Sequence, residues 1–238
     1  MAIKVDVGLH RISVNPHRGE AVALAQAIQA AQLPFAGLVS HAGHAYGAGN
    51  PQSIAAIAQQ EAQLMQQVKS ALREAGFTDC AISVGATPTA LAADIADGTY
   101  EIRPGNYALL DLTACRLGLS RVDELALSVI ARVVTVNEHF AIIDVGSKML
   151  SADKGPHVTD ASGFGVAVDE DGGRYEISKL SEEYDFLALQ GAAHRFGSLL
   201  RIFPNHSYAV MAQSASYVLR YADGRAEQQP VDARGCFL

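Results

Sequence analysis

The chain has 238 residues, of which 49% are hydrophobic and 18% charged, so it has enough apolar side chains for a packed core and lacks the composition of a disordered protein. A formal net charge of -7 without basic runs argues against a nucleic-acid partner. No stretch has the length of a signal peptide or a membrane span, and three widely spaced cysteines without a CxxC motif indicate a reducing compartment, so we expect a cytoplasmic protein with no membrane partner.

The first half of the chain alternates short β-like runs with alanine-rich amphipathic stretches. We predict strands at residues 3–7, 35–39, 81–84 and 102–111, the last broken by its turn, and helices at residues 18–32, 51–76 and 90–95. Because strands separated by helices pair in parallel through right-handed crossovers, this half is expected to be an α/β layer.

The second half has a different pattern, in which short strand candidates are separated by Gly, Asp, Asn or Pro. We predict strands at residues 129–137, 139–145, 164–168, 199–203 and 217–221, and a hairpin with a tight Asp/Gly turn at residues 169–177. This half is therefore expected to be a mostly antiparallel β domain, with a boundary near residues 118–125.

Two glycine turns lie at or just after the carboxyl ends of predicted parallel strands, in the segments Gly85–Thr89 and Arg103–Tyr107. Ligands bind at that edge of parallel sheets, and glycine lets backbone N–H groups approach an anion. Thr89 also suits the N-cap of the helix predicted at 90–95. The turns predict a phosphate cradle. A strand-to-helix cap followed by an ordinary type II turn explains the same residues.

Seven separated motifs share their order with those of one enzyme family: "KVDVGLHRISV", "GLVSHAGHAYG", "SVGATPT", "EIRPGNY", "IDVGSKMLSADKGP", "LSEEYDFL" and "IFPNHSY". With these motifs the chain resembles the D-threonine aldolase/D-serine dehydratase branch of the alanine-racemase-type (fold type III) pyridoxal-phosphate enzymes. The resemblance implies an α/β plus β fold. Residues 1–118 would form the second half of a (β/α)8 TIM-type barrel, and residues 119–238 a mostly antiparallel β domain that closes the site, usually across a dimer.

The resemblance also implies a pyridoxal-phosphate cofactor and the residues that hold it. Gly85, Ala86, Thr87, Gly105, Asn106 and Tyr107 would hold the phosphate. Arg11 would lie near the cofactor, and His41 and Tyr46 would line its pocket. In a β segment, however, His41 and His44 would point to opposite faces, which argues against a shared metal ion.

The lysine that binds the cofactor in this family lies on the first barrel strand, well before the "DVGLHR" motif, which here begins at Asp6. Roughly four of the eight barrel strands, and that lysine with them, are therefore expected to lie outside this chain. The five lysines present are interpreted as solvated side chains, and Lys4 is expected to open a strand, at the end away from the ligand.

The family's aldolases and dehydratases bind a divalent metal through a histidine and, two residues later, a cysteine or aspartate. Here the resemblance aligns His206 with the histidine, but Tyr208 stands at the second position, and a neutral phenol is a poor ligand. Tyr184 stands where the family typically has histidine. Either the metal is lost or the chemistry differs.

We therefore predict the C-terminal part of a pyridoxal-phosphate-dependent D-amino-acid lyase, whose lysine comes from a partner chain or another segment. A homodimer that covers the open barrel edges, or a rebuilt open sheet, are the other structural solutions. The alternative functions are a non-catalytic protein that binds pyridoxal phosphate and a purely structural or interaction subunit.

Overall fold

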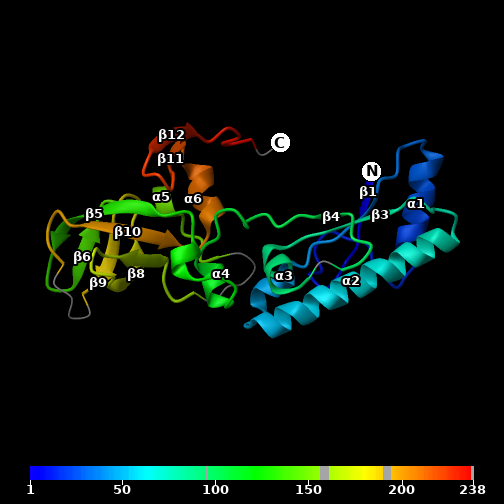
Figure 1. The fold of residues 1–238 in the computed structure, drawn as a ribbon, viewed down its shortest axis with the longest axis horizontal. Helices are drawn as coiled ribbons and strands as arrows, with labels where there is room; N and C mark the ends of the chain where they lie inside the picture. The colour runs from blue at the N-terminus through cyan, green and yellow to red at the C-terminus, as the bar shows by residue number, and fades with distance from the viewer. Residues whose placement is uncertain (95, 156–160, 190–193, 237–238) are drawn as a thin grey trace. The chain divides into compact units, whose positions relative to one another are not determined.

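A computed structural model describes residues 1–94, 96–155, 161–189 and 194–236 of the chain. Contacts divide the chain into two compact units (Figure 1). Unit 1 comprises Met1–Ala108 with Arg116–Leu119, and unit 2 comprises Leu109–Cys115 with Ser120–Leu238. Each unit has its own hydrophobic core, so each is described by itself.

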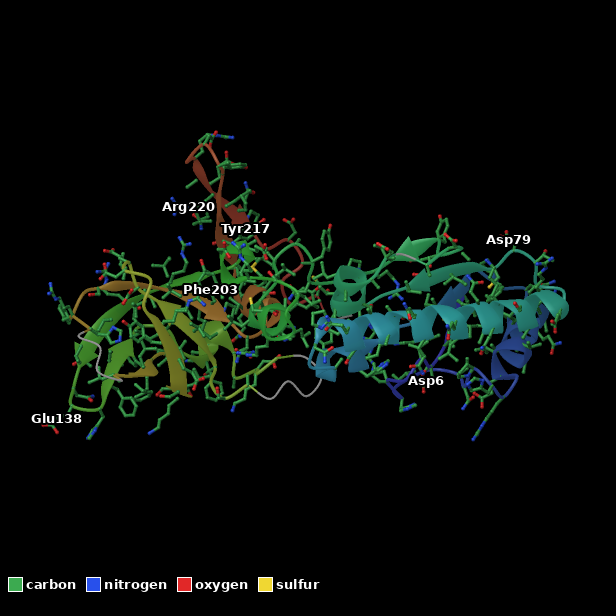
Figure 2. All side chains as sticks on the ribbon, turned by 60° about the horizontal axis from the view of Figure 1, so that its bottom comes forward. Asp6, Asp79, Glu138, Phe203, Tyr217 and Arg220 are labelled. Carbon is green, nitrogen blue, oxygen red and sulfur yellow. The ribbon has the colours of Figure 1, made fainter. Side chains whose placement is uncertain are left out.

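Unit 1 is an α/β layer whose four strands pair in parallel in chain order. The strands are β1 (Ala2–Lys4), β2 (Gly37–Val39), β3 (Ala81–Val84) and β4 (Glu101–Ile102). They are connected through α1 (Glu20–Ala30), the 3-10 helix η1 (Gly43–Gly47), α2 (Pro51–Glu74) and α3 (Thr87–Ala92). In Figure 2, Asp79 precedes β3 and Asp6 follows β1, so the two residues mark opposite ends of the parallel strands.

The register of the strands gives the sheet two faces of different chemistry. Ile3, Leu38 and Ile82 are paired neighbours, each 1% exposed, and they pack with buried side chains of α1 and α2. The next positions along the strands are Lys4, Val39, Ser83 and Glu101, which share the opposite face. We call these four residues the inner face, because helices cover the outside of a β/α barrel.

The long helix α2 has a clear start signal and one buried face. The Asn50 side chain accepts a hydrogen bond from the Ser53 N–H at 2.8 Å, and Pro51 occupies the first turn, where its missing N–H costs nothing. The buried residues recur at helical spacing: Ile54, Glu61, Met65, Val68 and Leu72. This pattern anchors α2 on the sheet.

The strand predicted at 81–84 is confirmed, and so are the helices predicted at 18–32 and 51–76, although the observed helices are slightly shorter at their ends. The strand predicted at 102–111 was wrong: β4 ends at Ile102, and α4 (Leu112–Arg116) follows. The Pro104–Gly105 turn ends the pairing, because proline lacks the N–H that a ladder needs. The helix predicted at 90–95 begins at Thr87 and ends at Ala92, and residue 95 lies outside the described residues.

Unit 2 contains a closed antiparallel barrel with the strand order β10-β5-β6-β9-β8-β7 (Figure 1). The bounds are β5 (Val129–Val136), β6 (Phe140–Ile143), β7 (Gly165–Val168), β8 (Arg174–Leu180), β9 (Asp185–Ala188) and β10 (Leu199–Pro204). Closure leaves no open edge in this sheet. The inward side chains, among them Val133, Ile177 and Leu187, form the core.

The remaining elements of unit 2 flank the barrel. They are η2 (Val122–Glu124), α5 (Ser147–Leu150), α6 (Ser207–Gln213) and the two-stranded sheet of β11 (Ser216–Arg220) and β12 (Ala226–Pro230). The predicted hairpin at 169–177 is confirmed: β7 pairs with β8, and Gly173 N–H donates to the Asp169 carboxylate at 2.7 Å. The sequence analysis missed β9 and β12. The prediction of an α/β part followed by a mostly antiparallel β part is confirmed.

Asp185 is a charged residue inside the barrel core. It opens β9, pairs with Ile143 and Leu180, and has no exposed surface. Neither carboxylate oxygen has a hydrogen-bond partner among the described residues. The nearby Ser181 N–H donates to the Tyr184 carbonyl at 2.8 Å. Burial raises the pKa of Asp185 to about 7, and the Ser181 backbone opposes this only in part.

The buried carboxyl should make the stability of the chain depend on pH. The folded chain holds the Asp185 proton more tightly than the unfolded chain does, so stability is lost as pH rises from the ordinary value of 3.8 through about 7. We expect Asp185→Asn to stabilise the protein relative to wild type by about 2 kcal/mol more at pH 8 than at pH 5. Urea unfolding at both pH values measures this. The exposed Asp171→Asn is the control, and equal pH profiles for wild type and Asp185→Asn would contradict the assignment.

Candidate functional site

The two glycine turns lie side by side in unit 1. Gly85 follows β3, and Arg103 follows β4, the strand paired with β3. A hydrogen bond of 2.9 Å joins the turns, from the Asn106 N–H to the Thr87 hydroxyl, and both residues are buried. The turns that the sequence placed about twenty residues apart therefore form one structure at the carboxyl edge of the sheet.

Gly85 is a point of close approach between the turns. A Cβ atom at this position would lie 2.8 Å from the Arg103 carbonyl oxygen and 2.9 Å from the Arg103 Cβ. Real Cβ contacts are longer, so only glycine lets the two backbones meet without displacement. The buried Ala86 is the N-cap of α3, and Thr89 is not the cap that was predicted: its hydroxyl donates back to the Ala86 carbonyl at 3.1 Å.

His41 reaches the same place from β2. Its Nδ1 lies 2.7 Å from the Gly85 carbonyl oxygen, so the ring donates to this backbone group. The structure thus brings together Gly85, Ala86, Thr87, Asn106 and His41 from the predicted cofactor site. Backbone amides at a strand end, with a hydroxyl and an imidazole beside them, are groups that suit a phosphorylated ligand.

Arg103 joins this site, although the sequence analysis did not select it. Its Nε donates to the Ser83 hydroxyl at 2.7 Å, and its Nη2 donates to the Ser40 carbonyl. The Ser83 hydroxyl in turn donates to the Glu101 carboxylate. Arginine thereby ties the ends of β2, β3 and β4 together on the inner face. Charged residues two positions apart, here 101 in β4 and 103 just after it, are the sequence signal that could have identified it.

The position of Lys4 differs from the one that the sequence predicted. Lys4 is the last residue of β1 rather than the opening of a strand, and it is half-buried on the inner face. Burial, together with the positive charges of Arg11 and Arg103, lowers the pKa of the Lys4 ammonium. The expectation of a solvated side chain is therefore wrong for Lys4.

The remaining predicted cofactor residues are exposed or belong to other elements. Arg11 is exposed, and Tyr107, at 63%, is the most exposed side chain of the second turn, which also exposes Gly105. Tyr46 lies in η1 and packs against a small cluster that contains Ile54 and Leu117.

His44 lies in η1 rather than in a β segment, so the geometry assumed for His41 and His44 was wrong. Its ring packs against Gly8, where a Cβ would lie 2.9 Å from two ring atoms. Burial lowers the pKa of His44, and His10 contributes in the same direction. Its Nδ1 has no partner among the described residues.

Unit 2 holds a second polar site, built around the start of α6. The Asp111 carboxylate accepts hydrogen bonds from the N–H groups of Thr113 and Ser207, both at 3.1 Å. The Thr113 hydroxyl donates to the Asn205 carbonyl at 2.8 Å, and the Asn205 side chain donates to the Gly163 carbonyl at 2.8 Å. These buried bonds fix the backbone on both sides of residue 206.

His206 and Tyr208 project from this fixed segment. His206 Nδ1 donates to the Asp153 carboxylate at 2.6 Å, and the ring of Tyr208 lies 5.6 Å from that of His206. Burial alone would raise the pKa of Asp153, but the hydrogen bond from His206 holds it below its usual range. Burial, with a contribution from Asp111, raises the pKa of Tyr208. Tyr184, the other departure from the family motif, is 49% exposed.

Two known protein families match different parts of the chain. Residues 1–113 match the N-terminal domain of alanine racemase, and residues 126–220 match a serine dehydratase domain. Among curated proteins, D-threo-3-hydroxyaspartate dehydratase of Delftia sp. is 33% identical over 94% of this chain and 63% of its own length. D-serine dehydratase of Dictyostelium discoideum is 28% identical over 90% of this chain and 59% of its own length.

Solved structures of these relatives share the fold. A cysteine-to-alanine variant of D-threo-3-hydroxyaspartate dehydratase, in a metal-free form, superimposes with a TM-score of 0.87 at 31% identity, over 96% of this chain and 64% of that one. D-threonine aldolase from Filomicrobium marinum gives a TM-score of 0.83 at 26% identity, over 100% of this chain and 64% of that one. The chain thus spans less than two thirds of the relatives that it matches. No helix within the described ranges is long and apolar enough to cross a bilayer.

The bond between the two turns can be tested directly. Thr87→Val removes the acceptor of the buried Asn106 N–H, so we expect a loss of about 1 to 3 kcal/mol in the free energy of unfolding and faster amide exchange at Asn106. Thr87→Ser keeps the hydroxyl and is the matched control. Denaturant unfolding and hydrogen exchange measure both effects, and a valine variant as stable as the serine variant would show that the bond contributes nothing.

Proposed function

Because the chain belongs to the alanine-racemase-type (fold type III) family of pyridoxal-phosphate enzymes, in the branch of D-amino-acid dehydratases and aldolases, we propose that it forms the C-terminal part of a D-amino-acid lyase. The observation that carries the proposal is the joined pair of turns at Gly85 and Asn106. Such a cradle at the carboxyl edge of a parallel sheet suits the phosphate of the cofactor.

The cofactor residues in this proposal are those of the turns and their neighbours. Gly85, Ala86, Thr87, Gly105, Asn106 and Tyr107 would surround the phosphate, with Arg11, His41 and Tyr46 nearer the ring. When bound, pyridoxal phosphate supplies an electron sink for the α-carbon of an amino acid. The chain's own part is to hold and orient it: Gly85 keeps the space open, and His41 and Thr87 fix the backbone of the two turns.

The proposed substrate class is a D-amino acid with a hydroxyl group on its β-carbon. Three relatives are named for such compounds: D-threo-3-hydroxyaspartate, D-serine and D-threonine. Dehydration breaks the bond between the α-carbon and its hydrogen, whereas aldol cleavage breaks the bond between the α- and β-carbons. In both cases the bound cofactor would stabilise the electron pair left on the α-carbon. The family likeness supports the class, and the choice between dehydration and aldol cleavage stays open.

We further propose that the lysine that binds the cofactor comes from a segment outside this sequence, either a missing segment or a partner chain. Unit 1 has four parallel strands, half the number in a (β/α)8 barrel, and the relatives are longer than the matched part. Three lysines have contacts of their own: Lys148 pairs with Glu182 and Glu183, while Lys154 and Lys179 lie over aromatic rings. Of the five, Lys4 is the one on the inner face.

A non-catalytic protein that binds pyridoxal phosphate is the second candidate. Tyr184 and Tyr208, at two positions where the family places other residues, favour it. In that case the cradle would bind the cofactor, and D-serine and D-threonine would not react even in the presence of a lysine-bearing partner.

The cradle predicts cofactor binding that depends on Gly85. Gly85→Val places side-chain atoms against the Arg103 backbone, so we expect the affinity of the chain for pyridoxal phosphate to fall by about tenfold or more, or about 1.4 kcal/mol. Equilibrium dialysis with absorbance detection measures this. Gly47→Ala is the matched control, because a Cβ there meets nothing within 4 Å. If the Gly85→Val variant and wild type bind pyridoxal phosphate with equal affinity, the cradle is not the binding site.

The source of the lysine can be found by chemical trapping. After borohydride treatment of the chain with pyridoxal phosphate, we expect no stoichiometric adduct by mass spectrometry, whereas a complex with a lysine-bearing partner segment should carry one on the partner. An adduct on Lys4 of the chain alone, absent from Lys4→Arg, would instead give this chain its own cofactor lysine.

A further inference from the structure

The polar site at the start of α6 fits only half of the metal site that the family implies. The retained half is His206. A histidine that binds a metal through one ring nitrogen usually donates its other N–H to a carboxylate, and His206 Nδ1 does so to Asp153 at 2.6 Å. Nε2 is therefore the ring nitrogen that would face a metal ion.

The second half of the site is missing because of one side chain. At residue 208, a thiolate or carboxylate would give an anionic ligand, whereas Tyr208 offers a neutral phenol. Its ring centroid already lies 5.6 Å from that of His206, so the pair is adjacent but does not form a ligand set. Within the described residues, no group of three His, Cys, Asp or Glu side chains is arranged to hold a metal.

The surrounding backbone leaves little room for a substitute ligand. Asp111, a carboxylate near Tyr208, accepts the N–H groups of Thr113 and Ser207. Asn205 is held on both its backbone and its side chain. With residues 205 to 207 fixed in this way, another side chain cannot take the place of residue 208 by a small shift.

We propose that the phenol of Tyr208 keeps this chain from binding the divalent metal of its family, and that the Asp153–His206 pair remains as an oriented half of that site. A single substitution at residue 208 should therefore restore metal binding. The consequence for catalysis rests on the proposed function: a lyase assembled from this chain would keep its activity in the presence of a chelator.

The test measures metal content rather than activity. The 238-residue chain and its variants are incubated separately with Zn²⁺, Mn²⁺ and Co²⁺, dialysed against metal-free buffer and analysed for bound metal. We expect wild type to retain no stoichiometric metal. Tyr208→Cys should retain about one Zn²⁺ or Co²⁺ per chain and give a thiolate-to-cobalt absorption band, and Tyr208→Asp should retain about one Mn²⁺ or Zn²⁺.

Two controls make the result specific to this site. Tyr217→Cys adds a thiol to β11 in the same unit, where Figure 2 shows Tyr217, and it should retain no metal. When combined with Tyr208→Cys, His206→Ala should abolish metal retention, and Asp153→Asn should weaken metal binding about tenfold or more.

Either of two results would overturn the proposal. Stoichiometric metal in wild type that disappears in His206→Ala would show that the phenol does not prevent binding. A Tyr208→Cys variant that folds like wild type by circular dichroism, yet gains no metal, would show that residue 208 is not what decides it. Neither result depends on pyridoxal phosphate, so failure of this proposal and failure of the proposed function are separable.

Discussion

The contact on which the site of unit 1 depends is the meeting of two backbone turns at the carboxyl edge of the parallel sheet. Parallel pairing of β3 with β4 brings the turns to one edge, and Gly85 lets them approach within a distance that any side chain would prevent. The hydrogen bond from Asn106 to Thr87 then joins them. The proposed phosphate cradle therefore depends on strand pairing and on the absence of a Cβ at Gly85.

The two faces of this sheet differ in polarity and in role. The helix-covered face is apolar and supplies the core that holds unit 1 together, through residues such as Ile3, Leu38 and Ile82. The inner face carries charge, and Arg103 ties its strand ends to Ser83 and to the Ser40 carbonyl. Polar groups can persist on the inner face because they bond one another, while the apolar core of unit 1 lies between the sheet and the helices.

In unit 2 the polar side chains lie beside a closed antiparallel barrel, whereas those of unit 1 lie on an open parallel sheet. Its barrel closes on itself, and the segment around residue 206 is held by buried bonds from Asp111, Thr113 and Asn205. Such a frame keeps His206 oriented whatever stands at residue 208. The proposed effect of Tyr208 on metal binding therefore requires no change in the fold around His206.

Local patterns in the sequence were enough to determine the alternation of strands and helices, the antiparallel character of the second half, the hairpin at 169–177 and the family motifs. These depend on periodicity and turn chemistry within a few residues. Tertiary structure alone decided the pairing of the turns, the role of Arg103, the half-buried position of Lys4, the short β4 and the unpartnered Asp185. Each of these depends on which strands become neighbours and which face a side chain meets, and a linear pattern does not contain that information.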